Sequence, residues 1–258
     1  MAEDLLSRLV LEARQDLQRR RYLVDSNRFE QAVAAYTPKD FVGALRRPHL
    51  AVIAEMKQRT PSMGVLSQDY RPADLAHAYA EGGAAAISVL THMAGFGGRV
   101  EHIRAVRAAT ELPILRKDFF SDPYEVAEAR ACGADAVLLI VAALEPLQLK
   151  DLVALSKSRS IAALVEVHDE RETSAALEAG ATVIGVNHRD LRTFEVDLSL
   201  TERLRKLVPH NVVVVAESGI RSAADAKRMR EAGADAILVG ELLMRSTDPA
   251  AQIRELQT

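Results

Sequence analysis

One pattern recurs four times along the 258-residue chain, at intervals of 50, 47 and 53 residues. In each copy a charged stretch typical of a helix ends at a glycine, and a short apolar run follows. Glycine readily takes the left-handed conformation that ends many helices, and a short β-branched run suits a strand buried on both faces. The repeat therefore predicts four helix–strand units, whose strands follow Gly83, Gly133, Gly180 and Gly233.

Four further apolar runs lie between the copies of this repeat and raise the number of expected strands to eight. Their spacing of roughly 20 to 35 residues leaves room for one helix in each gap. Strict alternation of strand and helix requires parallel strands with right-handed crossovers. Eight such units fit a closed (β/α)8 TIM barrel of the α/β class better than an open doubly wound sheet, although spacing alone leaves the open sheet possible. The strands are expected to start near residues 50, 85, 113, 136, 162, 183, 212 and 236.

Residues 1–48 precede the first expected strand and indicate an N-terminal helical extension of the barrel. One apolar stripe of this extension suits packing on the barrel, with a dimer contact as the alternative. The basic run 19–21 is expected to be a solvated face. Because no linker composition interrupts the chain, residues 1–258 are predicted to form a single domain, a normal length for one barrel. The stripe consists of Leu5, Leu6, Leu9 and Val10.

The composition argues against several classes of protein. A formal net charge of −3 does not suit a chain devoted to binding nucleic acid, and no apolar run approaches the ~18 residues of a membrane span. The N-terminus mixes acidic, basic and apolar residues, unlike a signal or transit peptide, so a cytoplasmic protein is expected. The single cysteine, Cys132, is predicted to be a small buried side chain. No histidines or cysteines occur at ligand spacing, so no metal is expected.

Charged side chains occur at the ends of four expected strands, where barrels of this kind carry their chemistry. Glu55 and Lys57 are two residues apart, so they share one face of the first strand. If that face is the barrel interior, they meet Lys117, Glu166 and Glu217 in one pocket. Buried charges are costly unless they are paired or functional. Two lysines beside several carboxylates suit general acid–base catalysis.

Glycines at the ends of the last two expected strands predict an anion site. Ser218–Gly219 and Gly240–Glu241 both fall where a strand passes into a helix. Backbone N–H groups at such positions favour phosphate, and barrels of this kind often bind phosphate there. Glu241 would contribute its backbone, because its carboxylate would repel the anion. No GxGxxG or Walker motif is present, so a small phosphorylated molecule is expected and a nucleotide is not implied.

His168 and His188 lie near the same end of the expected barrel. They are predicted to be loop residues rather than catalysts.

The chain resembles the indole-3-glycerol-phosphate synthase family over nearly its whole length. The matching segments occur in order and with the expected strand spacing, and the N-terminal helical extension is also similar to that of the family. The segments are IAEMKQRTPSMG (53–64), AISVLT (86–91), PILRKDF (113–119), ARACGADAVLLIVAAL (129–144), LVEVHDE (164–170), IGVNHRDLRTFEVDL (184–198), VAESGI (215–220) and ILVGELLMR (237–245).

The resemblance implies a carboxy-lyase of tryptophan biosynthesis that needs no cofactor. Its substrate would be 1-(2-carboxyphenylamino)-1-deoxyribulose 5-phosphate, and the indole ring would close by intramolecular attack on a carbonyl, with release of carbon dioxide and then water. Lys117 would be the acid at the carbonyl oxygen, and Lys57 and Glu166 would serve dehydration and aromatisation, although the two lysines could exchange roles. The other implied catalytic positions are the supporting carboxylates Glu55 and Glu217 and the orienting partners Asn187 and Ser218.

The resemblance also implies which residues bind the substrate, and a monomer or homodimer is expected. Near the phosphate it places Arg59, Gly219, Gly240 and Glu241. Near the anthranilate carboxylate it places Thr60, Ser62 and Arg189. Around the aromatic ring it places Phe96, Phe119, Leu138 and Leu191, for which packing in the core is the alternative.

The segment THMAGFGGRV (91–100) departs from the family pattern. His92 and small residues replace the polar residue and the aromatic residue that usually follow the threonine, and Arg99 stands where serine is common. Thr60 also replaces a usual serine. Two alternatives therefore stay open: a specialised or non-catalytic paralogue, and another phosphate-binding barrel isomerase. The presence of all five charged pocket residues weighs against the first, and the strand-end lysines do not match the cysteine–aspartate or aspartate pairs of the second.

Overall fold

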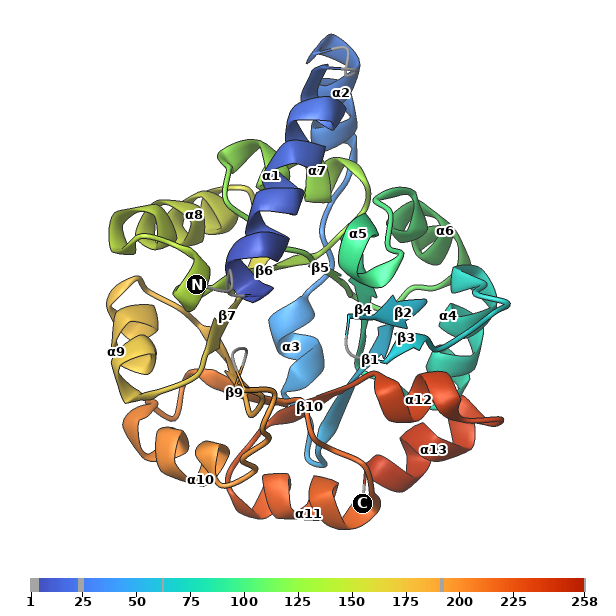
Figure 1. Cartoon of the computed structure of the whole chain (residues 1–258), viewed down its shortest axis with the longest axis vertical. Coiled ribbons are helices and arrows are strands. Elements are labelled where there is room, and N and C mark those ends of the chain that lie inside the picture. The colour runs from blue at the N-terminus through green and yellow to red at the C-terminus, as the bar shows by residue number, and fades with distance from the viewer. Residues whose placement is uncertain (1–4, 23–25, 62, 191–192, 258) are drawn as a thin grey trace.

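A computed structural model describes residues 5–22, 26–61, 63–190 and 193–257. Eight of its strands are parallel and close into a barrel in the order β1-β10-β9-β8-β7-β6-β5-β4, and helices surround this ring (Figure 1). Each strand begins within one residue of its predicted start, so the (β/α)8 barrel is confirmed and the open sheet was the wrong alternative. The strands are β1 (Ala51–Met56), β4 (Ala86–Leu90), β5 (Ile114–Lys117), β6 (Ala136–Ile140), β7 (Ala162–Val167), β8 (Val183–Asn187), β9 (Val213–Glu217) and β10 (Ala236–Val239).

Helices connect successive strands on the outside of the barrel. The four repeat glycines follow the ends of α4, α7, α9 and α11 and have φ between +81° and +93°, which confirms their predicted left-handed conformation. The outer helices are α4 (Pro72–Glu81), α6 (Glu101–Ala109), α7 (Pro123–Ala131), α8 (Pro146–Ser158), α9 (Glu170–Glu178), α10 (Leu200–Leu204), α11 (Ala223–Glu231), α12 (Glu241–Arg245) and α13 (Pro249–Leu256), with 3-10 turns at Val141–Ala143 and Arg205–Leu207.

Successive residues of each strand point in turn to the barrel interior and to the surrounding helices. In β1, Ala51 and Ile53 belong to the interior cluster, whereas Val52 and Ala54 pack among the helices. Helix α3 (Phe41–Leu45) contacts β1 and β4, adds apolar side chains to the interior cluster, and lies across the middle of the ring in Figure 1. The interior of the barrel is therefore packed, and Glu55 continues the inward alternation of β1.

The N-terminal extension forms α1 (Leu5–Tyr22) and α2 (Ser26–Ala35). These helices reach beyond one edge of the ring (Figure 1), and Leu6, Leu9 and Val10 are buried, so the predicted packing of the apolar stripe is confirmed. The prediction of a solvated face at 19–21 is wrong for Arg20. Its side chain is half-buried and pairs with Glu128 of α7 at 3.0 Å, because docking of α1 brings the two together across 108 residues of sequence.

Three short elements lie in the segments that follow β1 and β4. β2 (Arg59–Thr60) and β3 (Gly64–Val65) form an antiparallel hairpin, and α5 (Met93–Phe96) follows β4. None was predicted, because two to four residues are too few to show a periodic pattern.

Cys132 is buried, as predicted. Among the helices of the described residues, none is long and apolar enough to cross a membrane.

Candidate active site

A cavity of about 590 Å³ opens at the carboxyl ends of the barrel strands. The five charged side chains expected in one pocket all line it, because each continues the inward alternation of its strand. Leu5, Leu6 and Leu9 of α1 line the same cavity. The docked N-terminal helix therefore contributes apolar surface to a cavity whose charged groups come from the barrel.

Lys117 at the end of β5 lies between two carboxylates of other strands. Its Nζ is 2.8 Å from Glu217 Oε2 and 3.4 Å from Glu166 Oε2. Asn187 Nδ2 donates to Glu166 Oε1 at 3.1 Å, so β8 also holds the Glu166 carboxylate. The second lysine, Lys57, places its Nζ 2.5 Å from Glu55 Oε1. The site thus contains two cations, each held by a carboxylate and each facing the cavity.

The charges around Lys117 set its protonation and that of its partners. Burial would lower the pKa of the Lys117 amine, but the Glu217 and Glu166 carboxylates outweigh it and raise that pKa well above its ordinary value. Burial would raise the pKa of Glu166, but Lys117 and His168 lower it to about 2. Burial raises the pKa of Glu217 to about 7, although Lys117 acts against the rise. One cation between two buried carboxylates therefore favours the ionised form of Glu166 and makes Glu217 the easier of the two to protonate.

Two glycines provide the space that these carboxylates occupy. A Cβ on Gly185 would lie 2.0 Å from Glu217 Oε1, and a Cβ on Gly240 would lie 2.3 Å from Glu55 Oε1. Gly185 lies inside β8 and was missed by sequence reasoning. A glycine within a strand often marks a close approach of another group, so the run IGV (184–186) carried the signal. Any side chain at position 185 would displace the carboxylate that holds Lys117.

The end of β9 turns sharply at Ser218 and Gly219, which both line the cavity. Their φ angles are +66° and +80°, and a Cβ on Gly219 would lie 2.4 Å from Val196 Cγ1, so only glycine fits there. His188 is buried and its Nδ1 is 2.9 Å from the Ser218 carbonyl oxygen. Because a carbonyl oxygen only accepts, Nδ1 carries the proton, and Nε2 accepts from the Thr201 hydroxyl at 2.7 Å. His188 follows a strand end, as expected, and it also supports the strained turn.

The residues implied at the phosphate do not all lie together. Gly219, Gly240 and Glu241 line the cavity, as do Arg221 and Arg245, which sequence reasoning missed because each follows a strand end by several residues within a surface-type sequence. Arg59 is not among the described lining residues, and its guanidinium donates to the carbonyl oxygens of Met93 and Ala94 at 3.0 and 2.6 Å. In this structure Arg59 braces α5, and a role at phosphate stays a prediction.

The other implied binding residues surround the same cavity where the structure describes them. Thr60 lines it with its hydroxyl accepting from the Met63 N–H at 3.1 Å, and Arg189 donates to the Phe194 carbonyl oxygen at 3.3 Å. Ser62 and Leu191 lie outside the described residues. The apolar and aromatic side chains that line the cavity include Phe96, Phe119, Leu138, Met63 and Phe194.

The unusual segment 91–100 is ordered around His92. The imidazole is buried, and its Nδ1 accepts from the Gly95 N–H at 3.0 Å. The ring meets Phe119 and Phe96 edge-on, with centroids 5.2 and 6.2 Å apart. His92 therefore packs behind two aromatic side chains of the cavity wall, and the small residues after it permit the tight turn of α5.

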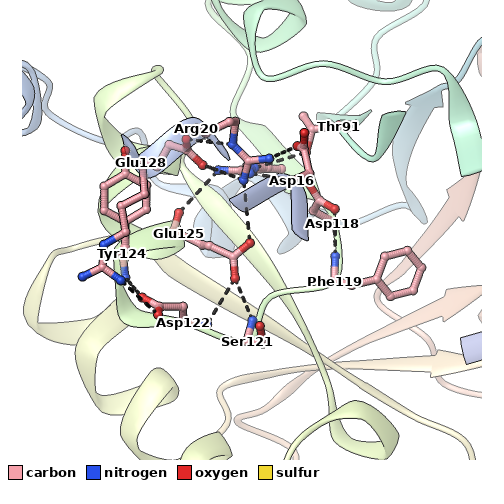
Figure 2. Close-up of polar contacts among 12 residues, drawn as sticks. Asp16, Arg20, Thr91, Asp118, Phe119, Ser121, Asp122, Tyr124, Glu125 and Glu128 are labelled. Carbon is pink, nitrogen blue, oxygen red and sulfur yellow. Dashed lines mark hydrogen bonds and ion pairs between the residues drawn. The ribbon is translucent and has the colours of Figure 1, made fainter. Parts of the chain in front are cut away.

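Arg116 and Asp118 flank Lys117 but point the other way, into the shell between β5 and the helices. The Arg116 side chain is fully buried and donates to Glu128 Oε2 at 2.8 Å, to Asp118 Oδ2 at 3.4 Å and to Thr91 Oγ1 at 3.1 Å. Glu128 also accepts from Arg20 of α1 at 3.0 Å, and Figure 2 shows Asp118 beside Phe119. The cluster thus joins the N-terminal helix to the strand end that carries Lys117.

Comparison with known proteins adds evidence of a different kind. The family model described as Indole-3-glycerol phosphate synthase matches residues 6–256. "Indole-3-glycerol phosphate synthase 2" of Streptomyces coelicolor is 58% identical over 98% of both chains, and the synthase of Dehalococcoides mccartyi strain CBDB1 is 46% identical over 98% of this chain and 99% of its own. A 3-hexulose-6-phosphate synthase structure matches with a TM-score of 0.64 at 20% identity over 81% of this chain and 98% of its own, which supports the barrel fold alone.

Among the described residues, no group of three histidine, cysteine, aspartate or glutamate side chains could hold a metal ion. The family match over residues 6–256, the identity to synthases that align over 98% of this chain and the cluster of two lysines with three glutamates agree with one another. This chain belongs to the indole-3-glycerol phosphate synthase family.

Proposed function

We propose that the chain is an indole-3-glycerol-phosphate synthase of tryptophan biosynthesis. It would convert 1-(2-carboxyphenylamino)-1-deoxyribulose 5-phosphate to indole-3-glycerol phosphate, carbon dioxide and water. The observation that carries the proposal is Lys117, held as a cation between Glu166 and Glu217 in a cavity that also has apolar walls and three arginines. Family membership and relatives of the same name support it.

Ring closure requires an acid at the ketone oxygen, because attack by the aromatic carbon places negative charge on that oxygen. The Lys117 ammonium fills this role in the proposal and is already positioned before the substrate binds. The bond between the ring carbon and its carboxylate then breaks, carbon dioxide leaves, and the electron pair restores the aromatic ring. The product of this step carries a hydroxyl group on the new five-membered ring.

Dehydration requires a second acid and a base. An acid protonates the hydroxyl group, which leaves as water, and a base removes a proton from the adjacent methylene carbon to complete the indole. We assign Lys57, held by Glu55, to the first task, and the ionised Glu166 to the second. Glu217 and Asn187 would orient Lys117 and Glu166, and Ser218 would orient the substrate.

In this proposal the charged and apolar parts of the substrate are bound by different groups of residues. The phosphate would lie by the backbone of Gly219, Gly240 and Glu241, with Arg221 and Arg245 as added cations, and the resemblance adds Arg59. The anthranilate carboxylate would lie by Arg189 and Thr60, with Ser62 from the resemblance. The aromatic ring would contact Phe96, Phe119 and Leu138, with Leu191 from the resemblance.

The direct test mixes purified protein with the carboxyphenylamino-deoxyribulose phosphate and follows indole fluorescence. We expect steady formation of indole-3-glycerol phosphate with equimolar release of carbon dioxide. Protein that is folded and binds the substrate but forms no indole would contradict the proposal and favour a non-catalytic paralogue. The proposal also includes a single domain over residues 1–258, a cytoplasmic location, no cofactor, and a monomer or homodimer.

Glu166→Gln should lower kcat about 10²-fold, within the range usual for loss of a general acid or base. Glutamine has nearly the same shape but cannot accept the methylene proton, so KM should change little. Steady-state kinetics with the fluorescent product measure both constants. Glu178→Gln, a change of the same kind at an exposed position of α9, is the matched comparison, and an equal loss in both variants would argue against Glu166 as the base.

Gly185→Ala should also lower kcat about 10²-fold, although it adds only one methyl group. That methyl would overlap Glu217 Oε1 and force the carboxylate away from Lys117, and a displacement of about 1 Å in a catalytic group can cost this much. Gly180→Ala is the control, because its added Cβ meets nothing within 4 Å and strains only the backbone at the end of α9. Wild-type kcat in Gly185→Ala would show that Glu217 has no part in the reaction.

A further inference from the structure

His168 continues the inward alternation of β7 one step beyond the catalytic carboxylate. It is two residues after Glu166, so the two side chains lie on the same face. The imidazole is not among the described groups that line the cavity, and its side chain is 17% exposed. It therefore contacts Glu166 without lining the cavity itself.

The His168 ring lies between two carboxylates. Its Nε2 is 3.4 Å from Glu166 Oε1, and its Nδ1 is 3.0 Å from Glu172 Oε2. Glu172 is in turn fixed in the first turn of α9: its carboxylate also accepts the His168 backbone N–H at 2.8 Å, and its own N–H donates to Asp169 Oδ1 at 2.7 Å. The imidazole is thus clamped from α9 and meets the same oxygen of Glu166 that Asn187 holds.

A neutral imidazole fits this arrangement poorly. It has one N–H and one lone pair, so one carboxylate would face a lone pair. Burial would lower the pKa of His168, but the Glu166 and Glu172 carboxylates outweigh it and raise the pKa to about 10. The described charged groups that face His168 and Glu166 are Glu172 on α9, Lys117 on β5 and Glu217 on β9. Glu217 contacts the same Lys117 ammonium as Glu166. The imidazolium therefore supplies Glu166 with a second positive charge. It lies by Oε1 of the carboxylate, whereas the Lys117 ammonium lies by Oε2.

We propose that His168, clamped by Glu172, is a positioning residue that holds the Glu166 carboxylate ionised and oriented to accept the substrate proton. Lys117 contacts Oε2 of that carboxylate, while His168 and Asn187 contact Oε1. The carboxylate is therefore restrained on both oxygens before the reaction begins. His168 does not exchange a proton with the substrate in this proposal, which rests on the proposed function for the role of Glu166.

The kinetic test compares His168→Asn with the wild type. We expect kcat to fall about 10- to 100-fold, because a displacement of about 1 Å in a catalytic group can cost about 10²-fold, with KM within about threefold. Loss of a cation raises the pKa of Glu166, so the acid limb of the kcat profile that belongs to Glu166 should move to higher pH. Glu172→Gln should move it in the same direction by less. His77→Asn, an exposed histidine on α4, should change neither quantity.

The second measurement is NMR of protein labelled with ¹⁵N-histidine, with His168 assigned from the spectrum of His168→Asn. Both ring nitrogens of His168 should stay protonated at pH 8 in the wild type, and the ring should titrate at lower pH in Glu172→Gln. Titration of wild-type His168 near 6.5 would overturn the proposal, as would a fall in kcat that leaves the pH profile unmoved. Because this readout needs no substrate, it separates failure of the His168 proposal from failure of the proposed function.

Discussion

Replacing Lys117 by methionine is expected to lower kcat by at least about 10³-fold, the largest effect on catalysis in this chain. Methionine keeps the length of the side chain but removes the acid at the ketone oxygen, a loss that alone costs about 10²- to 10⁴-fold. It also removes the cation shared by Glu166 and Glu217, so both buried carboxylates lose the contact that holds them in place. Indole fluorescence measures the rate.

A matched pair of variants assigns the two lysines. Lys117→Met should block release of carbon dioxide from carboxyl-labelled substrate, because ring closure precedes it. Lys57→Met should still release carbon dioxide in a first turnover but form little indole, because the hydroxylated intermediate would not dehydrate. The reverse pattern would show that the lysines exchange roles, and wild-type indole formation in Lys117→Met would refute the mechanism. Melting temperatures of both variants control for loss of folding.

Arg116→Met is expected to destabilise the protein by about 3–5 kcal/mol at pH 7, the scale for breaking a buried ion pair on one side. The arginine is fully buried, and its loss leaves Asp118 buried without its cation. Glu128 loses one of its two arginine partners and keeps Arg20 (Figure 2). Although Asp118 and Glu128 are buried, Arg116 holds the pKa of both carboxyls below the ordinary value. Urea denaturation of variant and wild type measures the free energy of unfolding.

The pH dependence of this loss has a definite sign. A carboxyl with a lowered pKa in the folded state contributes stability above its unfolded pKa, and the contribution is lost as pH falls through the folded pKa. The difference between Arg116→Met and the wild type should therefore be largest near pH 7 and shrink below about pH 4. Arg71→Met, which removes an exposed arginine paired with Asp69, should leave the free energy of unfolding almost unchanged, because exposed ion pairs contribute little. A similar small cost in Arg116→Met would contradict the role of the buried cluster.

Much of the candidate site could be predicted from sequence, because strand alternation is local. Glu55 and Lys57 face the interior since they are two residues apart on one strand, and the same parity brings Lys117, Glu166 and Glu217 to the cavity. Because Arg116 and Asp118 each lie one residue from Lys117, the same alternation indicates that they point outward. The same rule applied to His168 would have placed it beside Glu166, but a lone histidine past a strand end gave no reason to apply it.

What the sequence by itself determined was the barrel: eight apolar runs, left-handed glycines after four helices, and charges at interior positions of strand ends. Only the tertiary structure decided the partners of those charges. Arg20 reads as a solvated residue until α1 docks and Glu128 approaches it, and Gly185 indicates a close approach whose partner, Glu217 of the next strand, is decided only in the folded barrel. The physical reason is that periodicity follows from a few neighbouring dihedral angles, whereas an ion pair or a steric limit depends on distances between segments that meet only when the barrel closes.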